Sequence, residues 1–168
     1  GILVLESAHH AKQRNANIYA ELAGYSATCD ANHLTAPHPQ GVGAQSAMRF
    51  ALQSSGLFPD DIDYINAHGT STKLNDPIET AAIKAVFGEQ AYKLKVSSTK
   101  SMLGHLLGGA GGVEALITVK ALHDQFYPPT ANLENPDPSC DLDYVALNGV
   151  AKPMRAALSN SFGFGGHN

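Results

Sequence analysis

The sequence has no tryptophan, two cysteines and few charged residues, and each shortage narrows what the chain can be. Cys29 and Cys140 are too far apart for a zinc or redox motif. Two free thiols suit a reducing compartment, so we expect a cytoplasmic protein. Only 15% of the residues are charged, against about 25% in an average soluble domain. We therefore expect part of the surface to meet further chain or another subunit.

A basic excess and long apolar segments are also absent. The net charge is −4, which removes the electrostatic case for nucleic acid. No apolar run approaches the roughly 20 residues of a membrane span, so we expect no membrane partner. The first residues show no basic segment followed by a hydrophobic stretch, as a signal peptide would. They form an apolar run, Gly1 to Glu6, that is typical of a buried strand, so we expect the sequence to begin inside a fold.

Strand-like runs alternate with helix-like segments along the chain. Strands are predicted at residues 2–6, 18–28, 62–66, 94–96, 142–147 and 156–159. Helices are predicted at residues 7–16, 42–55, 76–88 and 113–123, the second ending at Gly56 and the third at Gly88. Asp76 to Glu79 has the pattern of a helix start, with Asp76 as the N-cap. The alternation predicts one α/β domain over residues 1–168 with a partly parallel sheet.

The first loop whose side chains could bind a ligand or take part in catalysis runs from Asn66 to Thr72, directly after a predicted strand. Ligands in open α/β sheets lie beyond the carboxyl ends of the strands. His68 stands between alanine and glycine, which leave its ring accessible, and Thr70 and Thr72 supply hydroxyls suited to binding amides or carbonyls. A surface histidine in a polar loop accounts for the same residues, so this loop alone leaves both interpretations open.

The second loop runs from Ser97 to Glu114 and is rich in glycine. Lys100 and His105 flank a short apolar turn, and five glycines stand between positions 104 and 112. Glycine costs helix stability by about 1 kcal/mol relative to alanine, so this accumulation predicts a close approach of backbone or ligand. Glu114 enters an apolar helix, and Lys100 or a backbone amide is its expected partner. A nucleotide loop is disfavoured because the lysine precedes the glycines, and the third glycine of a G-x-G-x-x-G pattern would fall at Glu114.

The third loop runs from Ser159 to Asn168. Phe162 and Phe164 alternate with glycines, which predicts a mobile loop that can place an aromatic ring over a pocket. A frayed terminus is the alternative, but such ends rarely keep paired phenylalanines.

The remaining histidines show no metal-binding pattern. His9 and His10 stand among polar residues and are expected to be solvated. His33, His38 and His123 lack H-E-x-x-H or any other ligand spacing, so we expect no metal site.

In this order, the three loops resemble the elongating β-ketoacyl-[acyl-carrier-protein] synthases, type II most closely. The segments that carry the resemblance are 66–72, 98–107 and 160–166, and it extends from Gly1 to Asn168. It implies a thiolase-like α/β fold, in which two similar halves stack as five α-β-α-β-α layers with a mixed sheet. This chain is similar to the C-terminal half. The resemblance also implies an acyltransferase that acts as a homodimer.

The activity implied by the resemblance is the decarboxylative Claisen condensation of fatty-acid elongation. An acyl thioester condenses with malonyl-acyl carrier protein to give 3-oxoacyl-acyl carrier protein. The implied partners are acyl carrier protein and its malonyl and acyl thioesters. No cofactor is expected, because the substrates travel on the 4'-phosphopantetheine arm of the carrier protein.

The resemblance also assigns roles to individual residues. It assigns catalysis to His68, His105 and Lys100, substrate binding to Thr70, Thr72, Gly163 and Phe164, and structural support to Asp76 and Glu114. Both histidines would be neutral imidazoles that donate hydrogen bonds to the enolate formed when CO₂ leaves. Phe164 would be a gate whose backbone N–H contributes to the oxyanion hole of the acyl thioester.

The chain departs from the family pattern in three respects. The family's nucleophilic cysteine precedes all these segments, and neither Cys29 nor Cys140 matches its context. We therefore expect the nucleophile in an N-terminal half outside this chain, and no acyl-enzyme from the chain alone. Lys73 stands where many members have proline, and His167 where threonine is usual. Both positions are expected at the pocket mouth.

Three alternative functions would leave different marks on the sequence. A non-catalytic, chain-length-factor-like partner subunit would often lose the active-site histidines, and both are present here. A ketosynthase domain of a polyketide synthase stays open, as does the preferred acyl length. A degradative thiolase fits poorly, because that family has a second cysteine near its C-terminal glycines, where this chain has Phe162 to Gly166.

Overall fold

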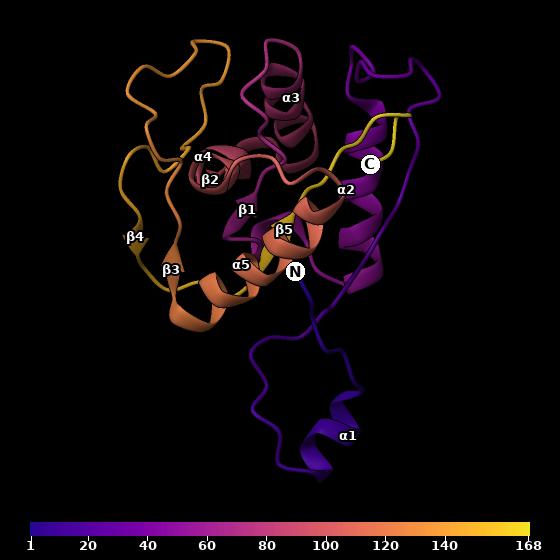
Figure 1. The fold of residues 1–168 in the computed structure, drawn as a ribbon, viewed down its shortest axis with the longest axis vertical. Helices are drawn as coiled ribbons and strands as arrows, with labels where there is room; N and C mark the ends of the chain where they lie inside the picture. The colour runs from indigo at the N-terminus through magenta and orange to yellow at the C-terminus, as the bar shows by residue number, and fades with distance from the viewer.

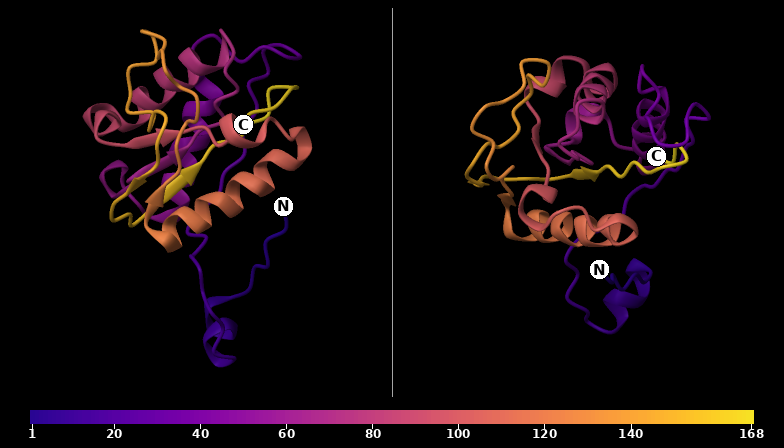
Figure 2. Two further views of the ribbon diagram at one scale, coloured as in Figure 1. Left: turned by 60° about the vertical axis from the view of Figure 1, so that its left-hand side comes forward. Right: turned by 45° about the horizontal axis from the view of Figure 1, so that its top comes forward.

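A computed structural model describes all 168 residues and shows a small parallel sheet with helices on both faces. The strand order is β2 (Lys95–Ser97), β1 (Tyr64–Asn66), β5 (Ala157–Ser159). Helices α2 (Val42–Ser55) and α3 (Asn75–Phe87) pack together on one face of the sheet. Helix α5 (Ala110–Asp124) covers the other face (Figures 1 and 2). The chain is therefore an α/β domain, as the sequence predicts.

Neighbouring residues of β1 contribute to two separate cores. Ile65 belongs to a cluster with Met48 of α2 and Ile83 of α3. Tyr64 belongs to a second cluster with Ala121 of α5. Because side chains alternate along a strand, this division follows from covering both faces of the sheet. All three residues of β1 are buried in consequence.

The strand register brings three carboxyl ends to one edge of the sheet. Asn66 at the end of β1 is paired with Ser97 of β2 on one side and with Ser159 of β5 on the other. The backbone N–H of Asn160 donates to the Asn66 carbonyl at 2.9 Å, which carries the pairing one residue further. The loops that follow the three strands therefore leave the sheet side by side, as parallel strands require.

Several predicted elements are confirmed. Helix α2 ends at Ser55, and Gly56 follows with φ +71°, the left-handed conformation that glycine adopts without strain. Helix α3 ends at Phe87 before Gly88. The predicted strands at 62–66, 94–96 and 156–159 correspond to β1, β2 and β5. Helix α1 (Ala8–Gln13) lies inside the predicted helix at 7–16, and α5 begins three residues before the predicted start at 113.

The predicted N-cap of α3 is wrong. The helix begins at Asn75, so Asp76 lies in its first turn. The Thr72 hydroxyl accepts the backbone N–H of Asn75 at 3.2 Å, and this bond starts the helix before Asp76 is reached. The Asp76 carboxylate instead accepts the backbone N–H of Ser71 at 3.1 Å. Asp76 thereby ties the loop after β1 to the helix.

Three predicted strands do not form. Residues 2–6 and 18–28 flank α1 in a segment that leaves the sheet and returns beside α2 (Figure 1). Only its end is paired, where the backbones of Thr28 and Asn168 exchange two hydrogen bonds at 2.9 and 3.0 Å. Residues 142–147 form only isolated bridges, Asp143 with Lys95 and Ala146 with Thr130. Positive φ angles at Val145 (+48°) and Leu147 (+63°) interrupt this run. Such angles strain a non-glycine residue and end regular strand geometry.

Short elements complete the chain. An antiparallel pair that the sequence did not predict, β3 (Phe126–Tyr127) with β4 (Val150–Ala151), follows α5. One-turn elements lie at η1 (Pro59–Asp61), η2 (Gly88–Tyr92), α4 (Lys100–Leu103) and η3 (Leu107–Gly109). Both cysteines are unpaired. None of the helices combines the length and the apolar character that crossing a bilayer requires.

Candidate active site

The loops after β1, β2 and β5 place two histidines and a phenylalanine against one another. The rings of His68 and His105 meet edge to face, with centroids 5.5 Å apart and an interplanar angle of 83°. The ring of Phe162 lies 5.5 Å from His68 on another side. The three predicted loops therefore converge on His68 at the carboxyl edge of the sheet.

Lys100 and Glu114 form a buried ion pair beside the histidines. Two residues separate the end of β2 from Lys100, which begins α4, and Glu114 lies on the buried face of α5. Their side chains are 6% and 4% exposed, and the Lys100 ammonium donates to one Glu114 carboxylate oxygen. Of the two partners expected for Glu114, Lys100 or a backbone amide, the structure shows Lys100. A buried charge needs such a partner, because an isolated one would lose its hydration uncompensated.

The environment of His68 keeps its imidazole neutral. Burial, the nearby Lys100 ammonium and His105 together lower the pKa of His68 to about 3. A charged ring would lose hydration and would face a second positive charge, so the protonated form is disfavoured. The Nδ1 atom of His68 is buried without a hydrogen-bond partner in the protein.

His105 holds its proton in a defined place. Its Nδ1 atom accepts the backbone N–H of Leu107 at 3.1 Å. Because an accepting nitrogen carries no hydrogen, the proton of the neutral ring must be on Nε2. His105 is exposed, so this Nε2–H can donate to a bound molecule.

Glu79 of α3 is a site residue that the sequence did not single out. Its buried carboxylate accepts the backbone N–H groups of His68 and Gly69, each at 2.9 Å. The side-chain amides of Asn160 and Asn75 donate to it at 3.1 and 3.3 Å. Burial raises the pKa of Glu79, while these donors act in the opposite direction. The available signal was helical spacing, because Glu79 lies one turn before the buried Ile83.

Gly69 allows the first two loops to touch. Its φ is +42°, and a Cβ atom there would lie 2.5 Å from the Cβ of Ser98. The Ser98 hydroxyl donates to the Gly69 carbonyl at 2.6 Å. Any side chain at this position would separate the loops, so the histidine-glycine sequence is a steric requirement.

The predicted substrate-binding residues are less closely gathered. Thr70 is half-buried and Thr72 exposed, and their hydroxyl oxygens are 3.1 Å apart on the loop after β1. Phe164 is 73% exposed, so the ring packed against His68 is that of Phe162. The backbone N–H of Gly163 donates to the His167 carbonyl at 2.7 Å, which closes the third loop on itself.

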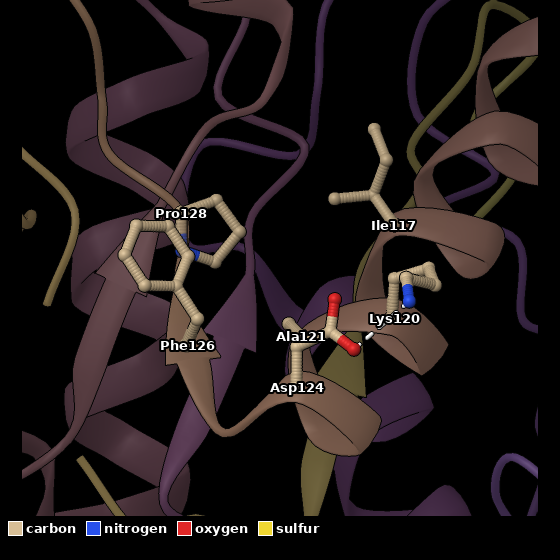
Figure 3. A pocket seen from close by; sticks show the side chains of 6 residues that line it. All are labelled: Ile117, Lys120, Ala121, Asp124, Phe126 and Pro128. Atoms are coloured by element: carbon tan, nitrogen blue, oxygen red, sulfur yellow. Dashed lines mark hydrogen bonds and ion pairs between the residues drawn. The ribbon is translucent and has the colours of Figure 1, made fainter. Parts of the chain in front are cut away.

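Two hollows lie outside the histidine cluster. One, of about 180 Å³, lies between α5 and β3 (Figure 3), lined by Ile117, Lys120, Ala121, Asp124, Phe126 and Pro128. The Lys120 ammonium and the Asp124 carboxylate form an ion pair there at 2.8 Å. The other, of about 420 Å³, is lined by residues 31–34 and Gly165 and borders the third loop.

Comparisons with known proteins agree on one family. The family model described as "Beta-ketoacyl synthase, C-terminal domain" matches residues 19–134. The 3-oxoacyl-[acyl-carrier-protein] synthase 2 of Synechocystis sp. is 60% identical over 168 residues, or 100% of this chain. The enzyme of the same name from Coxiella burnetii is 52% identical over 166 residues, or 99% of this chain. The chain spans 40% of the length of each of these relatives.

Solved structures agree with these relatives. A type II polyketide ketosynthase, determined with its acyl-carrier protein and a hexaketide, superposes with a TM-score of 0.94. It is 42% identical, and the match covers 96% of this chain and 40% of that one. A β-ketoacyl synthase from Burkholderia phymatum gives a TM-score of 0.90 at 40% identity, over 97% of this chain and 39% of that one. The fold is therefore the thiolase-like fold of ketosynthases.

Proposed function

The chain belongs to the β-ketoacyl synthase family, and we propose that it forms the decarboxylating part of a 3-oxoacyl-[acyl-carrier-protein] synthase active site. The observation that carries this proposal is the pair of histidine rings, 5.5 Å apart, beside the buried Lys100–Glu114 ion pair. Because the chain spans 40% of its relatives' length, the activity belongs to the complete synthase. In this proposal the nucleophilic cysteine lies outside these residues.

The proposed chemistry begins with the loss of CO₂ from malonyl-acyl carrier protein. The C–C bond between the malonyl methylene carbon and the carboxylate breaks, and the electron pair of this bond moves into the thioester to form an enolate. Hydrogen-bond donors fixed around the enolate oxygen stabilise this charge more than they stabilise the ground state. His105 presents Nε2–H because its Nδ1 accepts from Leu107. His68 stays neutral at physiological pH and supplies the second N–H.

The enolate carbon then attacks the carbonyl carbon of the acyl thioester on the cysteine. The cysteine leaves as thiolate, and the product is 3-oxoacyl-acyl carrier protein. In this proposal Lys100 keeps the adjacent His68 unprotonated, because its positive charge lowers the pKa of the ring. Glu114 holds the lysine in place. A protonated His68 would repel the ammonium, so Lys100 disfavours the protonated ring.

Acyl carrier protein is the proposed partner, and its 4'-phosphopantetheine arm carries the substrates without a further cofactor. The names of the relatives and the ketosynthase determined with its carrier protein support this partner. The arm would pass the Thr70 and Thr72 hydroxyls on its way to His68. Gly163 and Phe164 would line the acyl side. A cytoplasmic homodimer is proposed for the complete synthase.

Fatty-acid elongation is favoured over polyketide synthesis. The Synechocystis relative, whose name denotes 3-oxoacyl-[acyl-carrier-protein] synthesis, is 60% identical, while the superposed polyketide ketosynthase is 42% identical. The presence of both histidines also argues against a non-catalytic partner subunit.

Replacing either histidine by alanine tests the proposal. In the complete synthase, His68→Ala and His105→Ala are each expected to lower malonyl decarboxylation about 10²–10³-fold, the usual effect of losing one oxyanion donor. The measurement is CO₂ release from malonyl-acyl carrier protein under saturating substrate. Near-normal release in both variants would contradict the proposed function, provided that their melting temperatures match the parent protein.

A further inference from the structure

The loop after β1 leads from the buried histidine pair to the protein surface. His68 is buried, Thr70 is half-buried, and Thr72 and Lys73 are exposed. The hydroxyl oxygens of the two threonines are 3.1 Å apart. Lys73 therefore stands at the outer end of a row of polar side chains whose inner end is the candidate active site.

The segments that leave the carboxyl edge of the sheet contain no acidic residue. They are residues 67–74 after β1, 98–109 after β2 and 160–168 after β5. Their two lysines differ, because Lys100 is buried against Glu114 whereas Lys73 is exposed. Lys73 is thus the one lysine of this edge whose ammonium faces water. Such an edge attracts an anion, since no carboxylate of the three segments competes for the ammonium.

Lys73 also forms no ion pair elsewhere, although half of the lysines do. The paired ones are Lys84, Lys95, Lys100 and Lys120. Asp76 follows Lys73 by three positions, but its Oδ1 accepts the backbone N–H of Ser71 and the amide of Asn75, each at 3.1 Å. The Thr72 hydroxyl accepts the backbone N–H of Asn75 at 3.2 Å. The turn therefore fixes the backbone of Lys73 and leaves its ammonium free.

We infer that Lys73 binds the phosphate of the 4'-phosphopantetheine arm and so contributes to the choice of a phosphorylated substrate. This inference rests on the proposed function and deepens it. The arm has its thioester at one end and its phosphate at the other. With the thioester at His68, the arm passes the two threonines, and its phosphate stays at the surface, where a charged group keeps most of its hydration.

The substrate's other anion, the malonyl carboxylate, is at the wrong end of the arm to reach Lys73. It is part of the thioester group that meets the histidines, and it leaves as CO₂. Lys73 lies five positions beyond His68, on the exposed part of the loop. A lysine suits the phosphate because its ammonium is a point charge on a flexible stem, which needs no fixed geometry.

The experiment compares two small substrates that differ only in the phosphate, malonyl-4'-phosphopantetheine and malonyl-pantetheine. CO₂ release by the complete synthase gives kcat/KM for each, and their ratio measures what the phosphate contributes. In Lys73→Gln this ratio is expected to fall about two- to fivefold, the usual size of an exposed ion pair. The change is expected in KM for the phosphorylated substrate and not in kcat, because the phosphate takes no part in bond breaking. Added salt should narrow the difference between parent and variant.

Lys93→Gln is the matched control, because it makes the same change at an exposed lysine of the opposite edge. Lys93 follows η2 and precedes β2, so it lies at the amino edge of the parallel sheet. It is expected to keep the ratio of the parent protein. A ratio in Lys73→Gln equal to that of the control would overturn the inference. Equal losses with both substrates would also overturn it, since the lysine would then act without the phosphate.

Lys73→Arg tests whether the charge is what matters. Arginine keeps the positive charge and is expected to keep most of the ratio, so a ratio as low as that of Lys73→Gln would contradict the inference.

Malonyl-acyl carrier protein as substrate separates the phosphate from the protein that carries it. Lys73→Gln should lower kcat/KM for it by a similar factor as for malonyl-4'-phosphopantetheine. A loss seen only with the carrier protein would overturn the inference, because the lysine would then meet the surface of that protein. Near-normal decarboxylation in both His68→Ala and His105→Ala would instead remove the proposed function, so the two failures are distinguishable.

Discussion

His68 and His105 are the same residue type in opposite surroundings. His105 is exposed, and a backbone N–H fixes its proton on Nε2. His68 is buried, and burial together with Lys100 keeps it from taking up a second proton. A hydrogen bond thus sets the proton position of His105, whereas burial and a nearby charge disfavour the protonated form of His68. Neither depends on an acidic partner, which distinguishes the pair from the histidine-carboxylate arrangement of a general base.

The lowered pKa of His68 predicts how stability responds to pH. The folded ring protonates at about pH 3, whereas an unfolded histidine protonates near 6.5. Between these values the unfolded state binds the extra proton, so its population rises as the pH falls. The contribution of His68 to stability is therefore complete above pH 6.5 and is lost progressively below it.

Melting temperatures of the complete synthase at pH 7.5 and pH 5 test this, with His68→Gln as the comparison. From pH 7.5 to pH 5 the melting temperature of the parent protein is expected to fall further than that of the variant, because glutamine does not titrate. An equal loss in both proteins would show that His68 does not contribute.

At the scale of the elements, the site depends on what joins the loops to the helices. Glu79 connects α3 to the loops after β1 and β5, and the Lys100–Glu114 pair connects α4 to α5. Both connections use buried carboxylates. The strands themselves are short, three residues each in the parallel sheet. These side-chain bonds therefore help to hold the loops and helices in place, as longer strands would.

Breaking the buried ion pair is expected to destabilise the protein severely. Lys100→Met leaves the Glu114 carboxylate buried without its counter-charge, which typically costs about 3–5 kcal/mol. The double variant Lys100→Met/Glu114→Gln removes the uncompensated charge and is expected to recover a large part of that loss. Thermal or denaturant unfolding of the complete synthase measures both. A double variant that is no more stable than Lys100→Met would contradict this account of the pair.

The sequence was informative where the chemistry is local. The three loops could be predicted because glycines, histidines and phenylalanines stand close together within each, and α2 because its spacing and Gly56 are local features. Glu79 could not, because one of its donors is Asn160, 81 positions away. The apolar residues 2–6 and 18–28 form strands only if another strand lies beside them, and neither belongs to a sheet here, although Thr28 pairs with Asn168. Strand formation depends on its partner in a way that helix formation does not.

At the scale of the whole molecule, the apolar surface is the dominant feature. Large apolar side chains are exposed along the extended first segment, including Ile2 (88%), Val4 (87%) and Tyr25 (75%). Few charges separate them, since 15% of all residues are charged. Exposed apolar surface on this scale marks a region that other protein covers or that aggregates.

The chain expressed by itself is therefore expected to self-associate. Light scattering after size-exclusion chromatography should show oligomers or aggregates rather than a monomer of 17.6 kDa. The chain by itself should also fail to condense acyl and malonyl thioesters, because the proposed nucleophile lies outside these residues. Charged substitutions at Ile2, Val4 and Tyr25 are expected to reduce the association, since exposed side chains tolerate charge and charge opposes apolar contact. A monodisperse monomer would show that the apolar surface is stable in water without another protein covering it. Condensation by the chain alone would refute the assignment of the nucleophile to another part of the synthase.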